Sequence, residues 1–340
     1  MIKWIFTFFF MFVAPAVSAE NRTPLYVLSA TDTRAITDLI SAFERRYPEI
    51  KIVYREFHSN DLYNTIKLNK LDASFAADVV ISSAMDLQVK LVNEGMAFSY
   101  ESENSHLVPD WAKWRNELYG FTFEPVVIAY NKKIFGETFT PGSHAELAGY
   151  IRDQEARFLR RIGIYDIRKS GSGYLFASQD AIQSNQVFRL IESLGRARAK
   201  TYQSTSAILD GLENGELDLG YNLIGSYAIR RAQKNPDIGI SVISDYSLVM
   251  ARTAFIHKKA KHLREAENFI DFLLSEEGQQ AISKSSALIP INRKYQAKLD
   301  EIKGKSPFLP IKLGVSLLTY QDTLKKGNFL KSWEASILWE

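Results

Sequence analysis

Hydroxyl, glycine and tyrosine residues recur where β-rich runs of this sequence lead into helical runs. Four such junctions share this composition: "LSATDT" around Ser29 and Thr31, "ISSAMD" with Ser82 and Ser83, "SGSGY" from Ser170 to Tyr174, and "YNLIGSY" from Tyr221 to Tyr227. The first turn of a helix has backbone N–H groups without partners and carries a partial positive charge, so small polar residues there can hold an anion. The four junctions together predict an anion-binding cleft.

The predicted ligand-binding residues all come from these junctions. They are Ser29, Thr31, Ser82, Ser83, Ser170, Gly171, Ser172, Gly173, Tyr174, Tyr221, Asn222, Ser226 and Tyr227. Glycine at positions 171 and 173 lets an anion approach the backbone, because a side chain there would hold the anion away. The three tyrosines offer phenol groups that can donate to an anion or coordinate a hard metal. Each position also has a structural alternative, since Ser and Thr are ordinary N-cap residues and tyrosines are often half-buried in a core.

Catalytic and metal-binding patterns are absent from the sequence. "GKS" at 304–306 lacks the glycine of a phosphate-binding loop five residues earlier, where Leu299 stands. Ser172 lies between glycines, but Ser170 and Tyr174 occupy the outer positions where a nucleophile elbow has glycine. The five histidines show no metal-ligand spacing. We therefore expect no catalytic residue, no metal site and no cofactor.

The N-terminus and the composition indicate an exported protein. Lys3, a short apolar run, and the small residues Val17 and Ala19 predict a signal peptide cleaved near Ala19, and hence a periplasmic location; an uncleaved anchor is the alternative. The chain of 340 residues has no cysteine, which excludes disulfides and thiol chemistry. A net charge of +3 with mixed acids and bases gives no support to a nucleic-acid partner.

The elements that must position these junctions alternate between strand and helix. From Pro24, the run "PLYVLS" is followed by a helical pattern with Ile36, Leu39, Ile40 and Phe43 on one face, and similar pairs follow along the chain. This alternation predicts an α/β fold with mostly parallel sheets flanked by helices. The stretch "HLREAENFIDFLLSEEGQQAI" is predicted as one amphipathic helix.

Two long β-rich runs predict crossings between two lobes. They are "FTFEPVVIAYNKKIF" and "SLVMARTAFIHKKA". The predicted organisation is a signal peptide at 1–19, a discontinuous first lobe at 20–122 and 249–340, and an inserted second lobe at 123–248. The C-terminal "NFLKSWEASILWE" is predicted to be a helix that packs Phe329, Trp333 and Ile337 on the body.

The signal peptide, the two crossings, "EPVVIAYNKKIF" and "FIDFLLSEEGQQAIS" together resemble the periplasmic solute-binding proteins of ABC importers. The resemblance covers nearly the whole mature chain and is greatest to the branch with ferric-iron, 2-aminoethylphosphonate and phosphoglycerate binders. It implies a type II Venus-flytrap fold whose lobes close over a small ligand and then dock on a membrane permease. It also implies that Ser29, Ser82 and Ser83 contact the ligand from the first lobe, and "SGSGY" and "YNLIGSY" from the second.

The ligand expected from these residues is a small organic anion, favouring one with a phosphoryl or phosphonyl group. Iron-binding members of the branch place two adjacent tyrosines near "YNLIGSY", whereas Tyr221 and Tyr227 are six residues apart here. A ferric binder using Tyr174, Tyr221 and Tyr227 is therefore the first alternative. A ligand-binding adaptor for a sensor kinase is the second, and an exported phosphoester hydrolase is the most distant.

Overall fold

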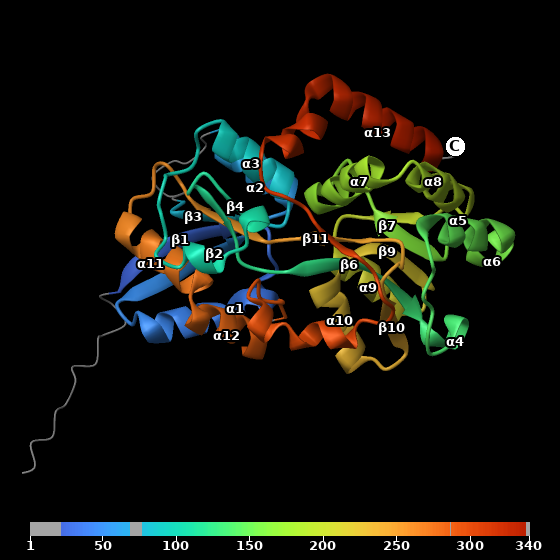
Figure 1. Ribbon diagram of the computed structural model, residues 1–340, viewed down its shortest axis with the longest axis horizontal. Coiled ribbons are helices and arrows are strands. Elements are labelled where there is room, and N and C mark those ends of the chain that lie inside the picture. Colours follow the sequence, from blue (N-terminus) through green and yellow to red (C-terminus); the bar gives the residue numbers. More distant parts are fainter. Residues whose placement is uncertain (1–21, 69–76, 286, 338–340) are drawn as a thin grey trace, which may run out of the picture.

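The computed structural model describes residues 22–68, 77–285 and 287–337, and shows two lobes side by side (Figure 1). Each lobe is built on one sheet with helices packed against it. The α/β class predicted from the alternation of strands and helices is confirmed, and so is the two-lobed arrangement predicted from the two β-rich runs. The predicted signal peptide, residues 1–19, lies outside the described residues.

The first lobe has a six-stranded sheet in the order β2-β1-β3-β12-β5-β4. Its strands are β1 (Thr23–Ser29), β2 (Ile50–Glu56), β3 (Val79–Ser82), β4 (Lys113–Trp114), β5 (Leu118–Gly120) and β12 (Thr253–Ile256). Its helices are α1 (Thr33–Arg46), α2 (Ser59–Lys67), α3 (Met85–Asn93), α11 (Leu263–Leu274) and α12 (Glu276–Ser285). The short 3-10 helices η2 (Ser105–Leu107) and η3 (Asp110–Ala112) precede β4, and η4 (Arg293–Tyr295) and η5 (Ala297–Glu301) follow α12.

The second lobe has a sheet in the order β13-β11-β6-β9-β7-β8, with β10 paired to β6. Its strands are β6 (Glu124–Asn131), β7 (Ile162–Tyr165), β8 (Lys200–Tyr202), β9 (Leu219–Ile224), β10 (Ile238–Ser241), β11 (Ser247–Met250) and β13 (Phe308–Pro310). Its helices are α4 (Lys132–Phe135), α5 (His144–Asp153), α6 (Glu155–Phe158), α7 (Gly171–Gln183), α8 (Gln186–Arg196), α9 (Thr205–Glu213) and α10 (Gly225–Lys234).

The sheets are mixed, which corrects the expectation that they are mostly parallel. β1 runs parallel to β2 and β3, and β7 runs parallel to β8 and β9. The strands next to the crossings break this pattern: β12 is antiparallel to β3 and β5, and β6 is antiparallel to β9, β10 and β11. A strand that carries the chain from one sheet directly into another needs no covering helix, so it is not restricted to parallel pairing.

The two crossings lie against each other and form the hinge between the lobes. The chain leaves the first sheet after β5 and enters the second at β6, and it returns through Ala251 and Arg252 between β11 and β12. The backbone N–H of Phe121 donates to the Arg252 carbonyl at 3.0 Å, and the Arg252 N–H donates to Thr122 Oγ1 at 2.8 Å. The return run, which reads as one β-rich stretch, is therefore two strands that meet at Arg252.

The predicted single helix 262–282 is two helices, which is a second correction. α11 ends at Leu274, and Ser275 has extended backbone angles and accepts a hydrogen bond from the Gly278 N–H at 3.1 Å, inside the first turn of α12. Gly278 is required at this corner because a Cβ there would lie 1.8 Å from the Phe272 carbonyl oxygen. The apolar periodicity continues across the break, so sequence periodicity alone does not reveal it.

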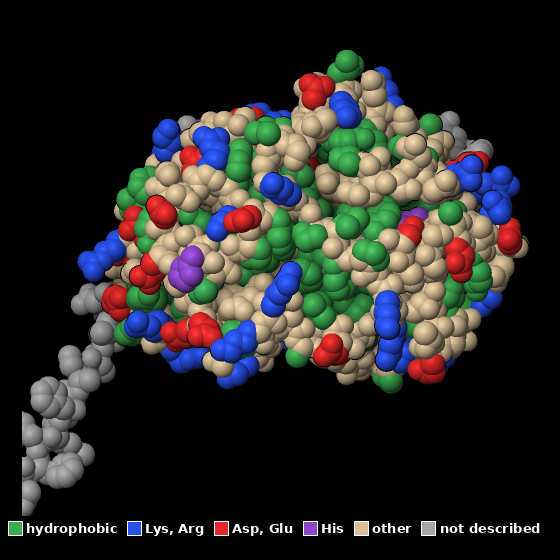
Figure 2. All heavy atoms as spheres, in the orientation of Figure 1, with side chains coloured by type: hydrophobic (Ala, Val, Ile, Leu, Met, Phe, Trp, Pro, Cys, Tyr) green, Lys and Arg blue, Asp and Glu red, His purple; other side chains and the backbone are tan. Residues whose placement is uncertain are grey.

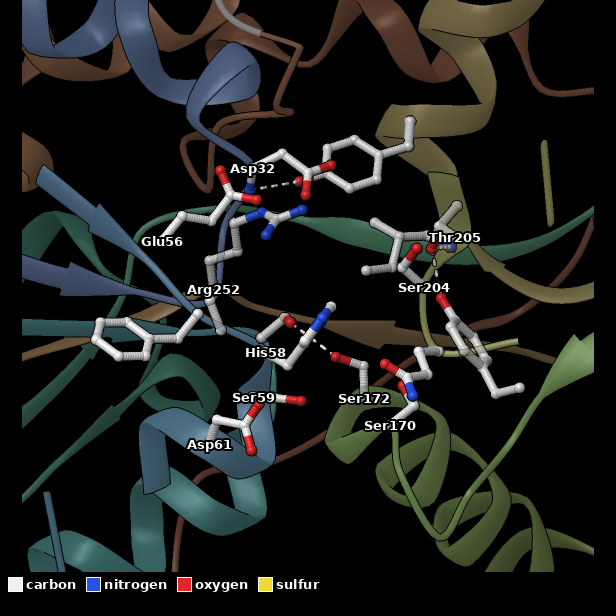
Figure 3. Close-up of a pocket in the computed structure, with 17 residues that line it drawn as sticks. Asp32, Glu56, His58, Ser59, Asp61, Ser170, Ser172, Ser204, Thr205 and Arg252 are labelled. Atoms are coloured by element: carbon white, nitrogen blue, oxygen red, sulfur yellow. Dashed lines mark hydrogen bonds between the residues drawn. The ribbon is translucent and has the colours of Figure 1, made fainter. Parts of the chain in front are cut away.

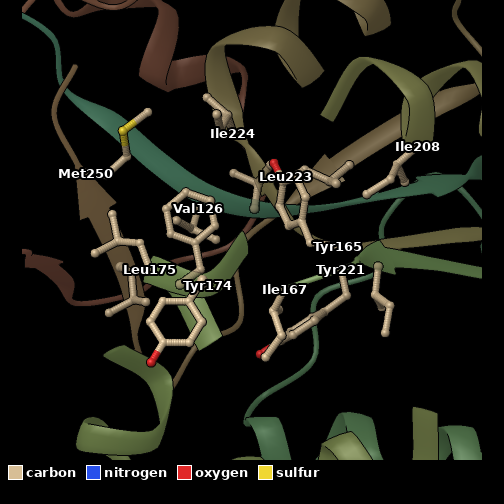
Figure 4. Close-up of a cluster of buried hydrophobic side chains, with 14 of the residues drawn as sticks. Val126, Tyr165, Ile167, Tyr174, Leu175, Ile208, Tyr221, Leu223, Ile224 and Met250 are labelled. Carbon is tan, nitrogen blue, oxygen red and sulfur yellow. The ribbon is translucent and has the colours of Figure 1, made fainter. Parts of the chain in front are cut away.

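One apolar core runs from the second lobe into the first, and a separate core lies within the first lobe. Aliphatic and aromatic side chains from β6, β7, β9 and α7 fill the second-lobe part of the larger core (Figure 4), which continues onto α2 and α3. The helices α1, α11 and α12 cover the separate core of the first lobe. On the face seen in Figure 2, acidic and basic side chains are interspersed, and hydrophobic side chains gather near its middle, where Figure 1 places β6 and β11. Within the described residues, no helix is both long enough and apolar enough to cross a membrane.

The C-terminal segment packs mainly on the second lobe. β13 pairs with β11, and the helix α13 (Thr323–Ile337) contacts α8 and buries Phe329, Trp333 and Ile337, as predicted. The division of the chain at 122/123 and 248/249 remains a proposal, which we amend by assigning 308–337 to the second lobe. The sequence pattern shows that this helix has an apolar face but does not show which lobe receives it.

Polar contacts also link this segment back to the first lobe, and one of them is the hydrogen bond from the Leu313 N–H to the Trp111 carbonyl at 2.8 Å. The 3-10 helix η6 (Val315–Gln321) packs on α3, and the Gln321 amide donates to the buried carboxylate of Asp86. Lys326 donates in turn to Gln321 Oε1 at 3.2 Å. Burial raises the pKa of Asp86 to about 6, although Gln321 and Lys326 oppose the shift.

Replacing Asp86 with asparagine is expected to stabilise the protein at neutral pH. The pKa of Asp86 is raised from 3.8 to about 6 on folding, so the folded state holds an unfavourable buried charge above pH 6. The free energy of unfolding of Asp86→Asn should exceed that of the wild type by about 1–3 kcal/mol at pH 7, since one pKa unit corresponds to about 1.4 kcal/mol. This advantage should shrink as the pH falls through 6 and disappear below 4.

Urea unfolding curves recorded from pH 4 to pH 8 measure this difference. The control is Asp300→Asn, at an exposed carboxylate, which should leave stability within about 0.5 kcal/mol of the wild type. A constant difference between Asp86→Asn and the wild type at every pH would contradict the assignment of a raised pKa.

Candidate functional site

A cavity of about 520 Å³ lies between the two lobes (Figure 3). Its first-lobe wall comes from the segments that follow β1, β2 and β3, and its second-lobe wall from the segments that follow β7, β8 and β9. Each of these segments leads from a strand into a helix, which is where ligands bind in open α/β sheets. The cavity is therefore built by the class of junction that the sequence indicated.

Four of the predicted site residues line this cavity: Ser83, Ser170, Ser172 and Tyr227. The hydroxyls of Ser83 and Ser172 lie 2.7 Å apart and join the two lobes directly. Ser170 is the N-cap of α7, and its hydroxyl accepts a hydrogen bond from the Gly173 N–H at 3.1 Å. Ser170 therefore caps α7, whereas the Ser172 hydroxyl forms a hydrogen bond to the opposite lobe.

Further hydrogen bonds hold the lobes together around the cavity. The Gly171 N–H donates to Ser59 Oγ at 2.9 Å, and Ser206 Oγ donates to Asp32 Oδ2 at 3.0 Å. The Asp32 N–H donates to the phenol oxygen of Tyr227 at 3.3 Å. Each of these contacts joins the first lobe to the second, so the structure represents a closed arrangement of the lobes.

Arg252 contributes the buried positive charge of the site. It is 1 % exposed and comes from the hinge, where its Nε donates to Glu124 Oε1 at 3.3 Å and its Nη1 donates to Thr31 Oγ1 at 2.9 Å. The guanidinium lies over the Tyr227 ring, 4.9 Å from the ring centroid. Its Nη2 is buried and has no hydrogen-bond partner among the described residues, while the side chain lines the cavity. A guanidinium held in this way can donate to a bound anion.

The protonation states of the groups around Arg252 follow from their burial. Burial raises the pKa of Tyr227 to about 12, with the positive charge of Arg252 opposing the shift, so its phenol is protonated at neutral pH. Burial also raises the pKa of Glu124, while the Arg252 charge lowers it. At neutral pH a ligand therefore meets a neutral phenol at Tyr227 beside the charged guanidinium of Arg252.

Ser29, Thr31 and Ser82 lie behind the cavity wall and do not line it. The Thr31 N–H donates to Ser29 Oγ at 3.0 Å, and the Ala84 N–H donates to Ser82 Oγ at 3.1 Å. Both contacts shape the loops that follow β1 and β3. Thr31 also accepts from Arg252, so it supports the guanidinium from behind.

Gly171 and Gly173 are required for packing, and neither lines the cavity. A Cβ at Gly171 would lie 2.7 Å from Ser59 Oγ in the opposite lobe, and a Cβ at Gly173 would lie 2.4 Å from the Tyr165 Cβ within the same lobe. The sequence predicted that these glycines let an anion approach the backbone, and the structure does not show this. Both positions require glycine because neighbouring side-chain atoms leave no room for a Cβ.

Tyr174, Tyr221, Asn222 and Ser226 lie away from the cavity. Tyr174 donates to the Tyr320 carbonyl in the C-terminal segment, and Tyr221 and Asn222 donate to the buried Asp180 at 3.1 and 2.6 Å. Figure 4 shows Tyr174 and Tyr221 within the apolar cluster of the second lobe. Ser226 is fully buried in the first turn of α10. Tyr174, Tyr221 and Tyr227 therefore do not meet at one site.

Sequence reasoning missed two of the junctions that build the cavity. The segment after β2 contributes Glu56, His58, Ser59 and Asp61, and the segment after β8 contributes Gln203, Ser204 and Thr205. The motifs "EFHSND" and "YQSTSA" carry the same hydroxyl-before-helix signal as the predicted junctions. Within the described residues, no group of three or more His, Cys, Asp or Glu residues is placed to hold a metal ion.

The family of bacterial extracellular solute-binding proteins matches residues 38–334. The chain belongs to this family. It is 32% identical to the substrate binding protein of an ABC transporter from Agrobacterium tumefaciens, over 94% of this chain and 95% of that one, with a TM-score of 0.85. The protein is therefore the solute-binding component of an ABC transporter, as the resemblance in its sequence implied. No curated protein matches it.

More distant solved structures share the fold of this solute-binding protein. Iron-bound HitA from Pseudomonas aeruginosa is 22% identical over 93% of this chain and 100% of that one, with a TM-score of 0.70. AfuA from Actinobacillus pleuropneumoniae, solved with fructose-6-phosphate, is 18% identical over 94% of this chain and 99% of that one, with a TM-score of 0.73. These two proteins hold different kinds of ligand in one fold, so the ligand must be argued from the cavity.

Proposed function

We propose that this solute-binding protein captures a small organic anion with a phosphoryl or phosphonyl group and delivers it to an inner-membrane permease. The observation that carries the proposal is the buried guanidinium of Arg252, whose Nη2 has no hydrogen-bond partner among the described residues of the closed lobes. Burying a donor of this kind is costly unless a ligand pairs with it. An anionic oxygen is the partner that a guanidinium binds best.

Helix N-termini in the cavity support the same ligand class. α7 and α9 begin at the second-lobe wall, and Ser172 and Thr205 lie in their first turns with hydroxyls near the cavity. Helix N-termini favour negative charge, and their backbone N–H groups suit the several oxygens of a phosphoryl group. Carboxylates at Asp32, Glu56 and Asp61 lie on the first-lobe wall, so the anionic group of the ligand is expected between Arg252 and the second-lobe wall.

The geometry does not favour ferric iron. Two or more phenolates on one hard cation need a fixed, shared geometry. Of the three tyrosines considered for iron, only Tyr227 lines the cavity, while Tyr174 and Tyr221 are engaged elsewhere. A solution with added iron should therefore lack the visible colour of a tyrosinate-to-iron complex.

Calorimetric titration of the mature protein tests the proposed ligand class. We expect heat of binding with phosphoglycerate or 2-aminoethylphosphonate and none with ferric citrate. Ser172→Ala should weaken the binding about tenfold, because it removes a hydroxyl donor near a charged ligand. Ser332→Ala, at an exposed serine of α13, should bind as the wild type does. Binding of ferric ion alone would overturn the organic-anion proposal.

The protein acts by closing its lobes, with no chemistry on the ligand. Closure about the crossings at 121–123 and 251–252 excludes water, and the closed form is what a permease can recognise. We propose a periplasmic location and a division of the mature chain at 122/123 and 248/249, with 308–337 belonging to the second lobe. Turnover of a phosphoester that disappears in Ser172→Ala would instead indicate a hydrolase.

A role as the ligand-binding adaptor of a sensor kinase would use the same cavity and the same closure. The two roles differ in their cellular effect. Deleting the gene should abolish uptake of the ligand if the protein serves a permease. Uptake that continues while a ligand-induced transcriptional response is lost would favour the sensory role.

A further inference from the structure

A second cavity of about 470 Å³ continues from the first between α1 and α10. The two cavities share Asp32, Glu56 and Tyr227 in their walls. Four basic side chains line the second cavity: Arg34 from the first lobe, and Arg230, Arg231 and Lys234 from the second. The carboxylates of Asp32, Glu56 and Asp210 line it as well, so its lining carries one net positive charge. Because both lobes contribute these side chains, the cavity exists only when the lobes meet.

Three of these four positive charges are not balanced by a carboxylate. Arg231 pairs with Asp210 at 2.7 Å and with Glu213 at 2.6 Å. Arg230 donates to the backbone carbonyl of Arg34 at 3.1 Å, which joins the lobes but leaves the guanidinium charge unneutralised. Among the described residues, no carboxylate lies within 4.0 Å of the charged groups of Arg34, Arg230 or Lys234. Basic groups gathered in this way at a cleft attract an anion.

The boundary between the two cavities is acidic, because the carboxylates of Asp32 and Glu56 lie in the walls of both. Asp32 accepts from Ser206 Oγ at 3.0 Å, and Glu56 accepts from the N–H and the hydroxyl of Thr33 at 2.7 Å each. Figure 3 shows both carboxylates at the same end of the first cavity. A carboxylate repels an anionic group but accepts hydrogen bonds from hydroxyl groups. The middle of a ligand that passes this boundary should therefore carry hydroxyls.

We propose that the ligand is a hydroxylated molecule with two anionic groups, and that the second cavity is the subsite for the second of them. The first group lies against Arg252 and the hydroxyls of the second lobe, and the second lies against Arg34, Arg230 and Lys234. This proposal rests on the proposed function, since it assumes that the first cavity binds a phosphoryl-type anion. It adds that the cleft selects for a second charge on the same molecule.

Matched pairs of ligands test the second subsite by calorimetry at physiological ionic strength. One pair is fructose 6-phosphate and fructose 1,6-bisphosphate, and the other is glycerol 3-phosphate and 3-phosphoglycerate; within each pair only the second compound carries two anionic groups. In at least one pair the wild type should bind the doubly anionic compound tenfold or more tightly. The double variant Arg34→Ala with Lys234→Ala should reduce this preference to threefold or less.

A matched control removes two positive charges away from the cleft. Lys305 and Lys331 are exposed and line neither cavity, so replacing both with alanine should leave the preference at its wild-type value. Equal affinities within both pairs, or a preference that survives in the Arg34→Ala, Lys234→Ala variant, would overturn the second subsite and leave the proposed function standing. Failure of all four compounds to bind would overturn both proposals.

Discussion

Replacing Arg252 with methionine is expected to lower the free energy of unfolding by about 3–5 kcal/mol and to abolish ligand binding. Arg252 and Glu124 are 1 % and 0 % exposed, and the variant leaves the carboxylate buried without its cation. Removing one partner of a buried ion pair has an effect of this size because the remaining charge is neither solvated nor paired. Binding should be lost because the same guanidinium lines the cavity and its Nη2 has no hydrogen-bond partner among the described residues.

Urea unfolding and calorimetric titration measure the two effects separately. The double variant Arg252→Met with Glu124→Gln should recover most of the stability, since it leaves no buried charge, but it should not recover binding. The loss of stability in Arg252→Met should be smaller at pH 5 than at pH 7, because the buried carboxyl of Glu124 takes up a proton as the pH falls.

The control for Arg252 is an ion pair of the same type on the surface. Arg46 and Glu277 lie 3.5 Å apart with side chains 57 % and 60 % exposed, so Arg46→Met should change stability by less than about 1 kcal/mol. A loss of stability in Arg252→Met no greater than that in Arg46→Met would show that Glu124 finds another partner.

Replacing Gly171 with valine should weaken ligand binding at least tenfold while leaving the stability of the protein nearly unchanged. A Cβ at this position would lie 2.7, 3.0 and 3.1 Å from atoms of Ser59, Ala84 and Leu87, all in the opposite lobe. The three nearest atoms all belong to the opposite lobe, so the added side chain obstructs closure and should affect the folded lobes themselves much less. A penalty of 1.4 kcal/mol on the closed form corresponds to a tenfold loss of affinity, and steric overlap of this kind costs about 1–3 kcal/mol.

Gly173 provides the contrast, although both glycines lie in the same motif. A Cβ there would meet the Tyr165 Cβ at 2.4 Å inside the second lobe, so Gly173→Val should lower the free energy of unfolding by about 1–3 kcal/mol. Gly327→Val in α13 is the control, because nothing lies within 4 Å of the added Cβ. Calorimetry and urea unfolding of the three variants separate the effects. Normal binding by Gly171→Val would show that closure does not bring α7 against α3.

Only some of the predicted site residues line the cavity, because a local sequence pattern does not show where a side chain points in the folded protein. The pattern of a hydroxyl before a helix identified Ser83, Ser170 and Ser172, which line the cavity. The same pattern selected Ser29 and Ser82, whose hydroxyls serve their own turns. A capping serine and a ligand-contacting serine have the same local sequence, so only the direction of the side chain in the folded lobe distinguishes them.

Arg252 shows the opposite case, a residue with no local signal. It stands in a β-rich run between Ala251 and Thr253, and nothing in that run separates it from Arg168 and Arg230, the other two arginines that the sequence leaves as candidates for the cleft. Its position at the meeting of β11 and β12 places it beside Glu124 and Thr31, which are more than a hundred residues away in the sequence. Its burial and its unpaired Nη2 are consequences of that long-range contact.

The sequence by itself determined the α/β class, the two lobes, their two crossings and the strand-to-helix junctions, because each follows from short-range periodicity and turn chemistry. The tertiary structure alone decided which junctions face the cavity, which lobe holds α13, and that the glycines at 171 and 173 serve packing. These features depend on contacts between residues distant in the chain. Local sequence preferences determine each helix and strand, whereas the packing of the two lobes against each other determines which residues form the ligand cavity.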